Sequence, residues 1–169
     1  AARLQTEAAA LARLEHPGIV PIHDAGRLAD GRLFYVMKLV RGKTLEAHLA
    51  DRPGLSERLG IFERICEPVA FAHALGFVHR DLKPENVMLL RGAGVDDFVK
   101  VMDFGISQAS WRPRLTGGER VAGTPQYMAP EQAQGLREQI DHRSDQFALA
   151  AIAYTLLTGQ EPFRGENPI

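Results

Sequence analysis

Hydrophobic residues at the start of the chain recur at the spacing of one helix face. The stripe ends at the stop signal His16-Pro17-Gly18, so the pattern predicts a helix over residues 1–15, with a buried face formed by Leu4, Ala8, Leu11 and Leu14. Two runs rich in apolar and β-branched residues follow at 19–25 and 33–40, and the turn signal Asp30-Gly31 lies between them. These runs predict an antiparallel hairpin.

The pattern in the middle of the chain is mostly helical. A short helix is predicted to residue 50 with Thr44 as its N-cap, and a long helix to Gly76 with Ser56 as its N-cap. The long helix would bury one face, formed by Leu59, Phe62, Cys66, Val69 and His73. After Gly76, short runs predict strands at 77–79, 87–90 and 98–102, with Gly92 and Gly94 turning the chain between the last two.

The last third of the chain begins without periodicity. Gly, Pro, Arg and Thr predominate over residues 107–126, which predicts a long irregular loop. Loops of that length are uncommon inside a compact domain and tend to be functional or disordered, so this loop needs an explanation. A helix is predicted from about Ser144 to Thr158, stopped by Gly159.

Composition favours one globular domain and narrows the function. The 169 residues are 45% hydrophobic and 24% charged, and 20 basic residues face 21 acidic ones, which does not suggest a nucleic-acid binder or a polybasic membrane patch. The longest apolar run, 147–157, is well short of the roughly 20 residues that span a bilayer. The single cysteine, Cys66, cannot form an internal disulfide and fits a core role in a reducing compartment. We expect a cytoplasmic domain without a membrane segment.

Four residues carry the candidate chemistry. Asp81, Lys83 and Asn86 lie in one predicted loop between short strands, and Asp103 follows the next strand. A carboxylate that accepts a hydroxyl proton, a cation and oxygen ligands for Mg²⁺ are what phosphoryl transfer needs. Beside Asp103, Gly105 would let the backbone turn and Phe104 could anchor that turn.

Three motifs in this order resemble those of protein kinases. They are His79-Arg80-Asp81-Leu82-Lys83-Pro84-Glu85-Asn86, then Asp103-Phe104-Gly105, then Ala129-Pro130-Glu131. The lysine in the first motif is typical of serine/threonine kinases. The sequences of residues 123–133 and 154–159 are similar to those of bacterial Hanks-type kinases. The resemblance covers nearly the whole chain. It implies the α+β bilobal kinase fold, with residues 1–40 as a remnant of the small lobe and hinge and 41–169 as an incomplete large lobe.

The resemblance also implies roles for the four candidates. Asp81 would be the catalytic base, Lys83 would contact the transferred phosphate, and Asn86 and Asp103 would hold Mg²⁺, or Mn²⁺ in its place. The substrates would be ATP and proteins with serine or threonine hydroxyls, with no nucleic-acid partner. On the ATP side the implied residues are Glu7 of helix C, the gatekeeper Met37, Lys38 and Val40 of the hinge, Met88, Lys83 and Asp103.

Further residues have implied structural or regulatory roles. They are the spine residues Leu11, Ile22, His79 and Phe104, together with Arg80, Gly105, Thr124 of the substrate-selecting loop, Glu131, and Asp145, which would brace the catalytic loop. Arg80 suggests control by phosphorylation of the activation loop, because an arginine can pair with a phosphate there. The candidate acceptors are Ser107, Ser110 and Thr116, which could equally be ordinary loop hydroxyls.

Some residues have ordinary alternatives. A glutamate on an exposed helix face is common, so Glu7 depends on the motifs downstream. The scattered histidines lack metal-ligand spacing, which argues against a zinc site, and His79 is expected to be a buried structural residue. Four more histidines are expected to cap, pack or lie at the surface, namely His16, His23, His73 and His142.

The 169 residues depart from the family pattern at both ends. They include neither a Gly-rich loop over the ATP phosphates nor the strand-three lysine that pairs with the helix C glutamate, and the arginine that usually pairs with Glu131 is not among them. We therefore expect these residues alone to transfer phosphate slowly or not at all. The alternative is a pseudokinase that acts as a binding or scaffold module, although the base, the lysine and both metal ligands are all retained.

Overall fold

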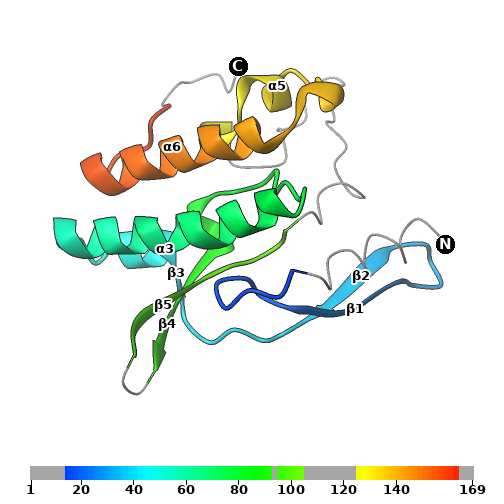
Figure 1. The fold of residues 1–169 in the computed structure, drawn as a ribbon, viewed down its shortest axis with the longest axis horizontal. Coiled ribbons are helices and arrows are strands. Elements are labelled where there is room, and N and C mark those ends of the chain that lie inside the picture. Colours follow the sequence, from blue (N-terminus) through cyan, green and yellow to red (C-terminus); the bar gives the residue numbers. More distant parts are fainter. Residues whose placement is uncertain (1–13, 93–94, 105–124, 164–169) are drawn as a thin grey trace.

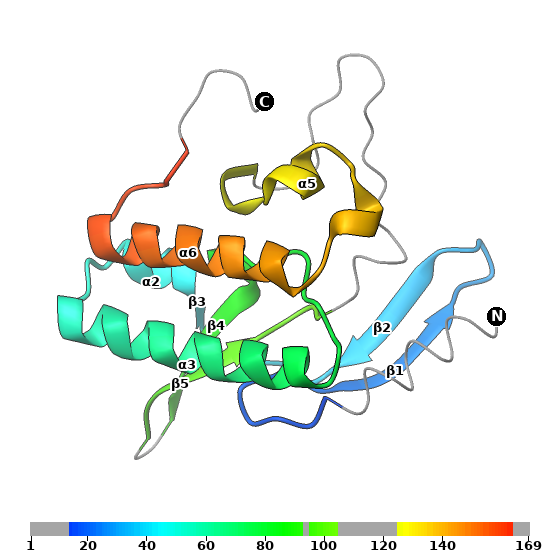
Figure 2. The same ribbon diagram turned by 45° about the horizontal axis from the view of Figure 1, so that its top comes forward.

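The computed structural model describes residues 14–92, 95–104 and 125–163. Two long helices, α3 (Leu55–Ala74) and α6 (His142–Thr158), run side by side, and α3 also packs against a three-stranded sheet (Figure 1). A separate two-stranded hairpin projects beside this sheet, as both ribbon views show (Figure 2). The predicted N-terminal helix falls on residues 1–13, outside the described residues, and Leu14 and Glu15 are not helical.

The predicted hairpin is confirmed. Strand β1 (Ile22–Arg27) pairs antiparallel with β2 (Leu33–Met37), and Gly31 takes φ +87° in the turn between them. The first strand begins later than predicted because the residues before it pair elsewhere. Val101 donates its N–H to the carbonyl of Gly18 (2.7 Å), and Val20 donates to Val101 (3.0 Å). This pairing joins the start of the described chain to strand β5.

The two helices of the middle region are confirmed, with corrections. Helix α2 (Leu45–Leu49) is capped as predicted, because the N–H of Ala47 donates to the Thr44 hydroxyl (3.1 Å). Helix α3 has Gly54 at its N-cap, so Ser56 is not the cap. The predicted buried face was right only at Val69: Leu59 is 46% exposed, and the buried residues are Ile61, Ile65, Pro68, Val69 and Ala72. Apolar side chains occupy two neighbouring stripes of this helix, so Phe62 and Cys66 are only half-buried.

Strands β4 (Val87–Gly92) and β5 (Val95–Val101) confirm two of the three strands predicted after α3. The strand predicted at 77–79 was wrong. The N–H of Phe77 donates to Ala72 and that of His79 to the side chain of Asp145, so neither joins a ladder. The sheet gains instead the two-residue strand β3 (Lys43–Thr44), which pairs with β4 and was too short to predict.

Helix α6 confirms the last predicted helix. Asp141 caps it by accepting the N–H of Arg143 (2.8 Å), and Gly159 ends it with φ +70°. Most of the predicted irregular loop, residues 105–124, lies outside the described residues. Four short elements were not predicted from the pattern: η1 (Pro84–Asn86), η2 (Pro125–Tyr127), α5 (Pro130–Ala133) and η3 (Arg137–Gln139).

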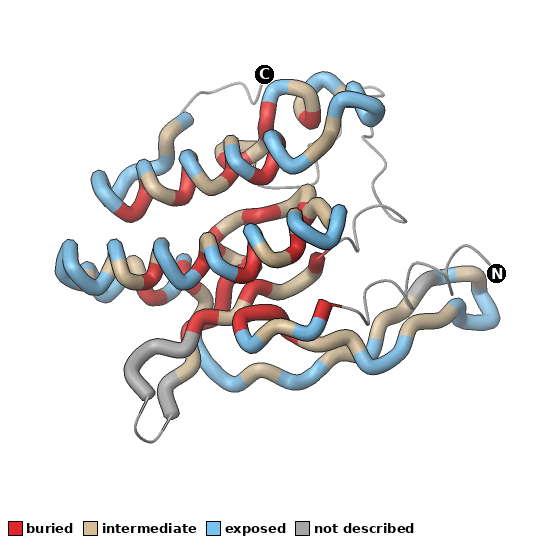
Figure 3. The backbone as a smooth tube through the Cα atoms, in the orientation of Figure 1, coloured by how far each residue is buried: buried red, intermediate tan, exposed pale blue. Residues whose placement is uncertain are grey.

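The buried core lies where the long helices meet the three-stranded sheet (Figure 3). It joins Ile61 and Ile65 of α3 to Ile152 of α6 and to Val87 and Val101 of the sheet. The described side chains of the hairpin are all half-buried or exposed, although Ile22 packs against the core. Among the described residues, no helix is long and apolar enough to cross a membrane.

Candidate active site

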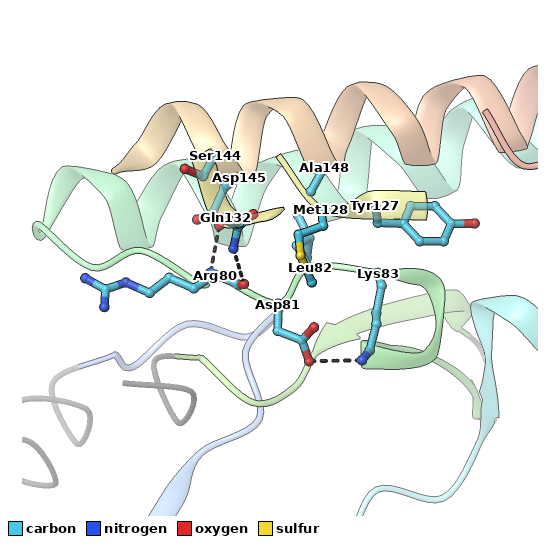
Figure 4. Close-up of a pocket in the computed structure, with 10 residues that line it drawn as sticks. All are labelled: Arg80, Asp81, Leu82, Lys83, Tyr127, Met128, Gln132, Ser144, Asp145 and Ala148. Carbon is cyan, nitrogen blue, oxygen red and sulfur yellow. Dashed lines mark hydrogen bonds and ion pairs between the residues drawn. The ribbon is translucent and has the colours of Figure 1, made fainter. Parts of the chain in front are cut away.

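The loop between α3 and β4 brings three predicted site residues together. The Asp81 carboxylate pairs with the ammonium of Lys83 (Oδ2 to Nζ, 3.0 Å), and the amide of Asn86 donates to the Asp81 carbonyl (2.7 Å) and to the same Oδ2 (3.1 Å). The Asp81 side chain is 44% exposed, whereas that of Lys83 is 17% exposed and Asn86 is buried. The carboxylate is thus accessible and held by one half-buried and one buried neighbour, and Figure 4 shows its pairing with Lys83.

Asp103 lies directly after β5, in an unusual conformation. Its backbone has φ +63°, a region that residues other than glycine rarely adopt and that is often found at functional sites. Burial raises the pKa of its half-buried carboxyl group above the usual value, the nearby carboxylate of Asp81 adds to this effect, and the ammonium of Lys83 opposes it. Asp103 therefore lies within electrostatic reach of Asp81 and Lys83, which belong to the proposed catalytic loop, residues 79–86.

Asn86 and Asp103 fit a Mg²⁺ site. Two carboxylates near each other, one of them partly desolvated, favour a cation, and an amide oxygen is a suitable hard ligand. Both hydrogen bonds of the Asn86 amide to Asp81 use Nδ2, so Oδ1 would be its ligand atom. Within the described ranges, no group of three or more His, Cys, Asp or Glu is arranged to hold a metal.

His79 is fully buried, as expected, and contacts Phe104. The two rings meet edge to face with centroids 4.6 Å apart. Nε2 lies 2.7 Å from the carbonyl of Met102, and the N–H of Asp81 donates to Nδ1 (3.2 Å), so the neutral ring with its proton on Nε2 satisfies both partners. Burial lowers the pKa of His79, which agrees with a neutral structural ring.

Asp145 lies in the first turn of α6, and its carboxylate has three hydrogen-bond partners outside that helix. It accepts the N–H of His79 (2.7 Å) and of Arg80 (2.8 Å), and its Oδ2 lies 2.8 Å from Nε2 of His73. The side chain is 1% exposed, and the helix N-terminus favours its negative charge. The sequence singled out Asp145 but not His73, which was interpreted as an ordinary packing or surface residue.

Glu131 has a partner among the described residues. Its carboxylate accepts a hydrogen bond from the hydroxyl of Ser144, next to Asp145. This hydrogen bond is a different contact from the family's pairing with an arginine, which stays a prediction. A hydroxyl donor carries no sequence pattern of its own, so no signal in the sequence indicated this contact.

The predicted ATP-side residues lie on both sheets. Met37 and Lys38 stand at the end of β2, where the N–H of Lys38 donates to the carbonyl of Pro21 (3.1 Å), and Val40 follows half-buried. Met88 is buried on β4, opposite Thr44 and Lys100. An adenine site built from these residues would span the two sheets. Several predicted residues lie outside the described ones, namely Glu7, Leu11, Gly105, Ser107, Ser110, Thr116 and Thr124.

The pocket next to Asp81 also contains residues that the sequence did not single out. It lies between the catalytic loop, the segment around Tyr127 and Met128, and the start of α6, and Gln132 lines it as well (Figure 4). The amide of Gln132 donates to the carbonyl of Arg80 (2.6 Å). This link joins the segment after the predicted activation loop to the residue before Asp81.

Comparisons with known proteins agree with this geometry. Residues 1–169 match the family described as protein kinase domain. The chain is 42% identical over 174 residues to the serine/threonine-protein kinase pkn3 of Myxococcus xanthus, covering 99% of the chain and 31% of that protein. It is 37% identical over 167 residues to the serine/threonine-protein kinase PknH of Mycobacterium tuberculosis, covering 98% of the chain and 26% of that protein. The chain thus spans less than a third of these relatives.

A solved structure has the same fold. The crystal structure of the kinase domain of Mycobacterium tuberculosis PknI superposes with a TM-score of 0.73 at 34% sequence identity. The match covers 99% of this chain and 62% of that one. The described elements are therefore arranged as in part of a kinase domain.

Proposed function

The chain belongs to the protein kinase domain family, and on that premise we propose that it transfers the γ-phosphate of ATP to serine and threonine hydroxyls of proteins. The observation that carries the proposal is the convergence of Lys83 and Asn86 on the carboxylate of Asp81. The names of the relatives, which describe serine/threonine kinases, support the choice of acceptor.

Asp81 is the proton acceptor in this proposal. Its exposed carboxylate orients the substrate hydroxyl and takes its proton as the new bond to the γ-phosphorus forms. The bond between that phosphorus and the oxygen bridging it to the β-phosphate breaks, so ADP leaves. Lys83, 3.0 Å from Asp81, stabilises the negative charge of the phosphoryl group during transfer.

Asn86 and Asp103 are the proposed Mg²⁺ ligands, and Mn²⁺ has the same preference for oxygen donors. The bound cation supplies charge neutralisation at the phosphates. Within the chain, Asn86 has a second task, since its amide holds both the main chain and the side chain of Asp81. We also propose the division into a small-lobe and hinge part at 1–40 and a large-lobe part at 41–169, which agrees with the separate hairpin.

The test is phosphate transfer by the full-length protein from labelled ATP with Mg²⁺ to a general protein substrate such as casein. The wild type should label serine and threonine, and Asp81→Asn should lower kcat by about 10²–10⁴-fold. Asp24→Asn is the matched control, because Asp24 is exposed on the hairpin strand β1. This variant should keep wild-type activity.

Two outcomes would contradict the proposal. If the wild type binds ATP but labels no protein under any metal condition, the chain is a pseudokinase module. If Asp81→Asn transfers phosphate as fast as the wild type, Asp81 is not the proton acceptor.

A further inference from the structure

Gln132 is a buried amide whose two ends are both engaged. It belongs to the short helix α5 and is 6% exposed. Its Oε1 accepts the N–H of Ala129 (3.1 Å), and its Nε2 donates to the carbonyl of Arg80 (2.6 Å), 52 residues earlier in the chain. A side chain at this place must both accept and donate, which a carboxylate or an alkyl group cannot do.

The residue that Gln132 contacts has a strained backbone. Arg80 has φ +69°, in the left-handed region that is costly for a residue with a side chain. Its N–H donates to Asp145 of α6 (2.8 Å), and its carbonyl accepts from Gln132 of α5. Side chains of two different helices therefore hold the N–H and the carbonyl of this residue (Figure 4).

These contacts fix the peptide group that leads into Asp81. The carbonyl of that peptide belongs to Arg80 and is held by Gln132, while its N–H belongs to Asp81 and donates to the ring of His79 (3.2 Å). Because the peptide group is planar, holding both its oxygen and its hydrogen restricts the plane from which the Asp81 side chain extends.

We propose that Gln132 is a positioning residue for Asp81, acting through the carbonyl of Arg80. The proposal rests on the proposed function, because the position of the carboxylate matters only if it meets a substrate hydroxyl. Gln132 would also couple Asp81 to the segment just before α5, because Tyr127 and Met128 of that segment line the same pocket as Asp81. Without the amide, the Arg80 carbonyl loses a buried donor and the peptide can rotate.

The alternative is that Gln132 only satisfies buried polar groups and stabilises the fold. The two roles differ in their effect on kinetics. A structural loss lowers the amount of folded enzyme and leaves the turnover of each folded molecule unchanged. A misplaced base lowers kcat of the folded enzyme while the KM for ATP stays the same, because Asp81 acts on the hydroxyl and not on the nucleotide.

The experiment compares four variants of the full-length protein. Gln132→Met removes both hydrogen bonds at similar size, and Gln132→Glu removes the donor. Gln134→Met and Gln134→Glu are the matched controls, because Gln134 is exposed at the end of the same helix. Both Gln132 variants should lower kcat by about 10–100-fold at pH 8 with the KM for ATP within about threefold, because small misplacements of reacting groups have effects of this size. The controls should stay within about twofold of the wild type, as expected for exposed positions.

The pH dependence of Gln132→Glu gives a signature that a structural role lacks. A protonated carboxyl group can donate to the Arg80 carbonyl and accept from Ala129, as the amide does. The deficit in kcat relative to the wild type should therefore shrink from pH 8 to pH 6. For Gln132→Met the deficit should stay constant over this range, since this side chain cannot titrate.

Hydrogen exchange of the backbone amides of residues 77–83 tests whether Gln132 holds this peptide group, and it does not require an activity measurement. Exchange should be faster in Gln132→Met than in the wild type, and unchanged in Gln134→Met. Equal exchange in Gln132→Met and the wild type overturns the proposal, and so does faster exchange with an unchanged kcat. A wild type that transfers no phosphate refutes the proposed function instead, and the exchange data then still decide whether Gln132 holds this peptide.

Discussion

The catalytic loop and the β1–β2 hairpin are held in different ways. In the loop, the main chain of His79, Arg80 and Asp81 is bonded to side chains, including two that are 52 and 65 residues away from Arg80. In the hairpin, the main chain is held by its own ladder, and side-chain hydrogen bonds such as those of Arg32 with Asp30 and of Arg27 with the carbonyl of Gly31 join residues close in sequence.

This difference follows the proposed roles of the two regions. A base and its neighbours need fixed side chains, so distant helices hold their backbone and the cost of the strained Arg80 is offset by buried hydrogen bonds. The hairpin carries the proposed hinge, which would meet adenine with backbone atoms. Its ladder is sufficient for that purpose, and its side chains can remain half-buried or exposed. Substitutions should therefore affect the two regions very differently.

The largest expected difference is between two aspartates. Asp145→Ala leaves the N–H groups of His79 and Arg80 without their buried acceptor, so we expect a loss of about 3 kcal/mol or more in the free energy of unfolding. Asp24→Ala in the hairpin removes one exposed hydrogen bond, to the N–H of Ala25, and should cost less than about 0.5 kcal/mol. Urea denaturation followed by circular dichroism measures both. Similar losses for the two variants would break the comparison.

Two glycines provide a second, smaller test. A Cβ on Gly42 would press against the carbonyl oxygen of Leu89, in the strand that follows the catalytic loop, and that backbone is held in the sheet. We expect Gly42→Ala to cost about 1–3 kcal/mol, the usual range for overpacking. In the hairpin, a Cβ on Gly26 would meet only the ring of Phe34, which can rotate away. Thermal unfolding should show a clearly smaller loss for Gly26→Ala, and the reverse order would contradict the expectation.

The clustering of the candidate residues could be predicted because they are close in sequence. Asp81, Lys83 and Asn86 belong to one short segment, and one loop is enough to bring them together. The contacts that hold this loop could not be predicted. Gln132 meets its partner through the packing of α5 against the loop, and His73 meets Asp145 through the packing of α3 against α6. Neither residue has a periodic pattern or a motif spacing that indicates such a contact.

The fold shows the same limit of sequence patterns. The hairpin and the helices α2, α3 and α6 follow from apolar periodicity and turn signals. The buried face of α3 does not, because Phe62 and Ile61 start two adjacent apolar stripes and only tertiary packing chooses between them. Strand β3 has two residues, too few for an alternating pattern to reveal it.

The smallest expected effect is a pH dependence of stability that arises in the catalytic loop, at His79, and not in the hairpin. The buried ring of His79 uses both nitrogens while neutral, and burial lowers its pKa below the ordinary value of 6.5. Well above pH 6.5 the ring is neutral in both the folded and the unfolded chain. Below that pH the unfolded chain takes up a proton that the folded chain does not. Stability should therefore fall as the pH drops, by at most about 1.4 kcal/mol per pH unit for one proton.

His79→Phe isolates this contribution, because it keeps a ring against Phe104 and removes the titrating group. The variant should be less stable than the wild type at pH 8, since the carbonyl of Met102 and the N–H of Asp81 lose their partner. The gap between the two proteins should then narrow from pH 7 to pH 5, as only the wild type loses stability through this ring. Parallel curves would mean that His79 accepts a proton in the folded chain. In that case the catalytic loop would tolerate a charge at its centre, and its packing would be looser than its hydrogen bonds indicate.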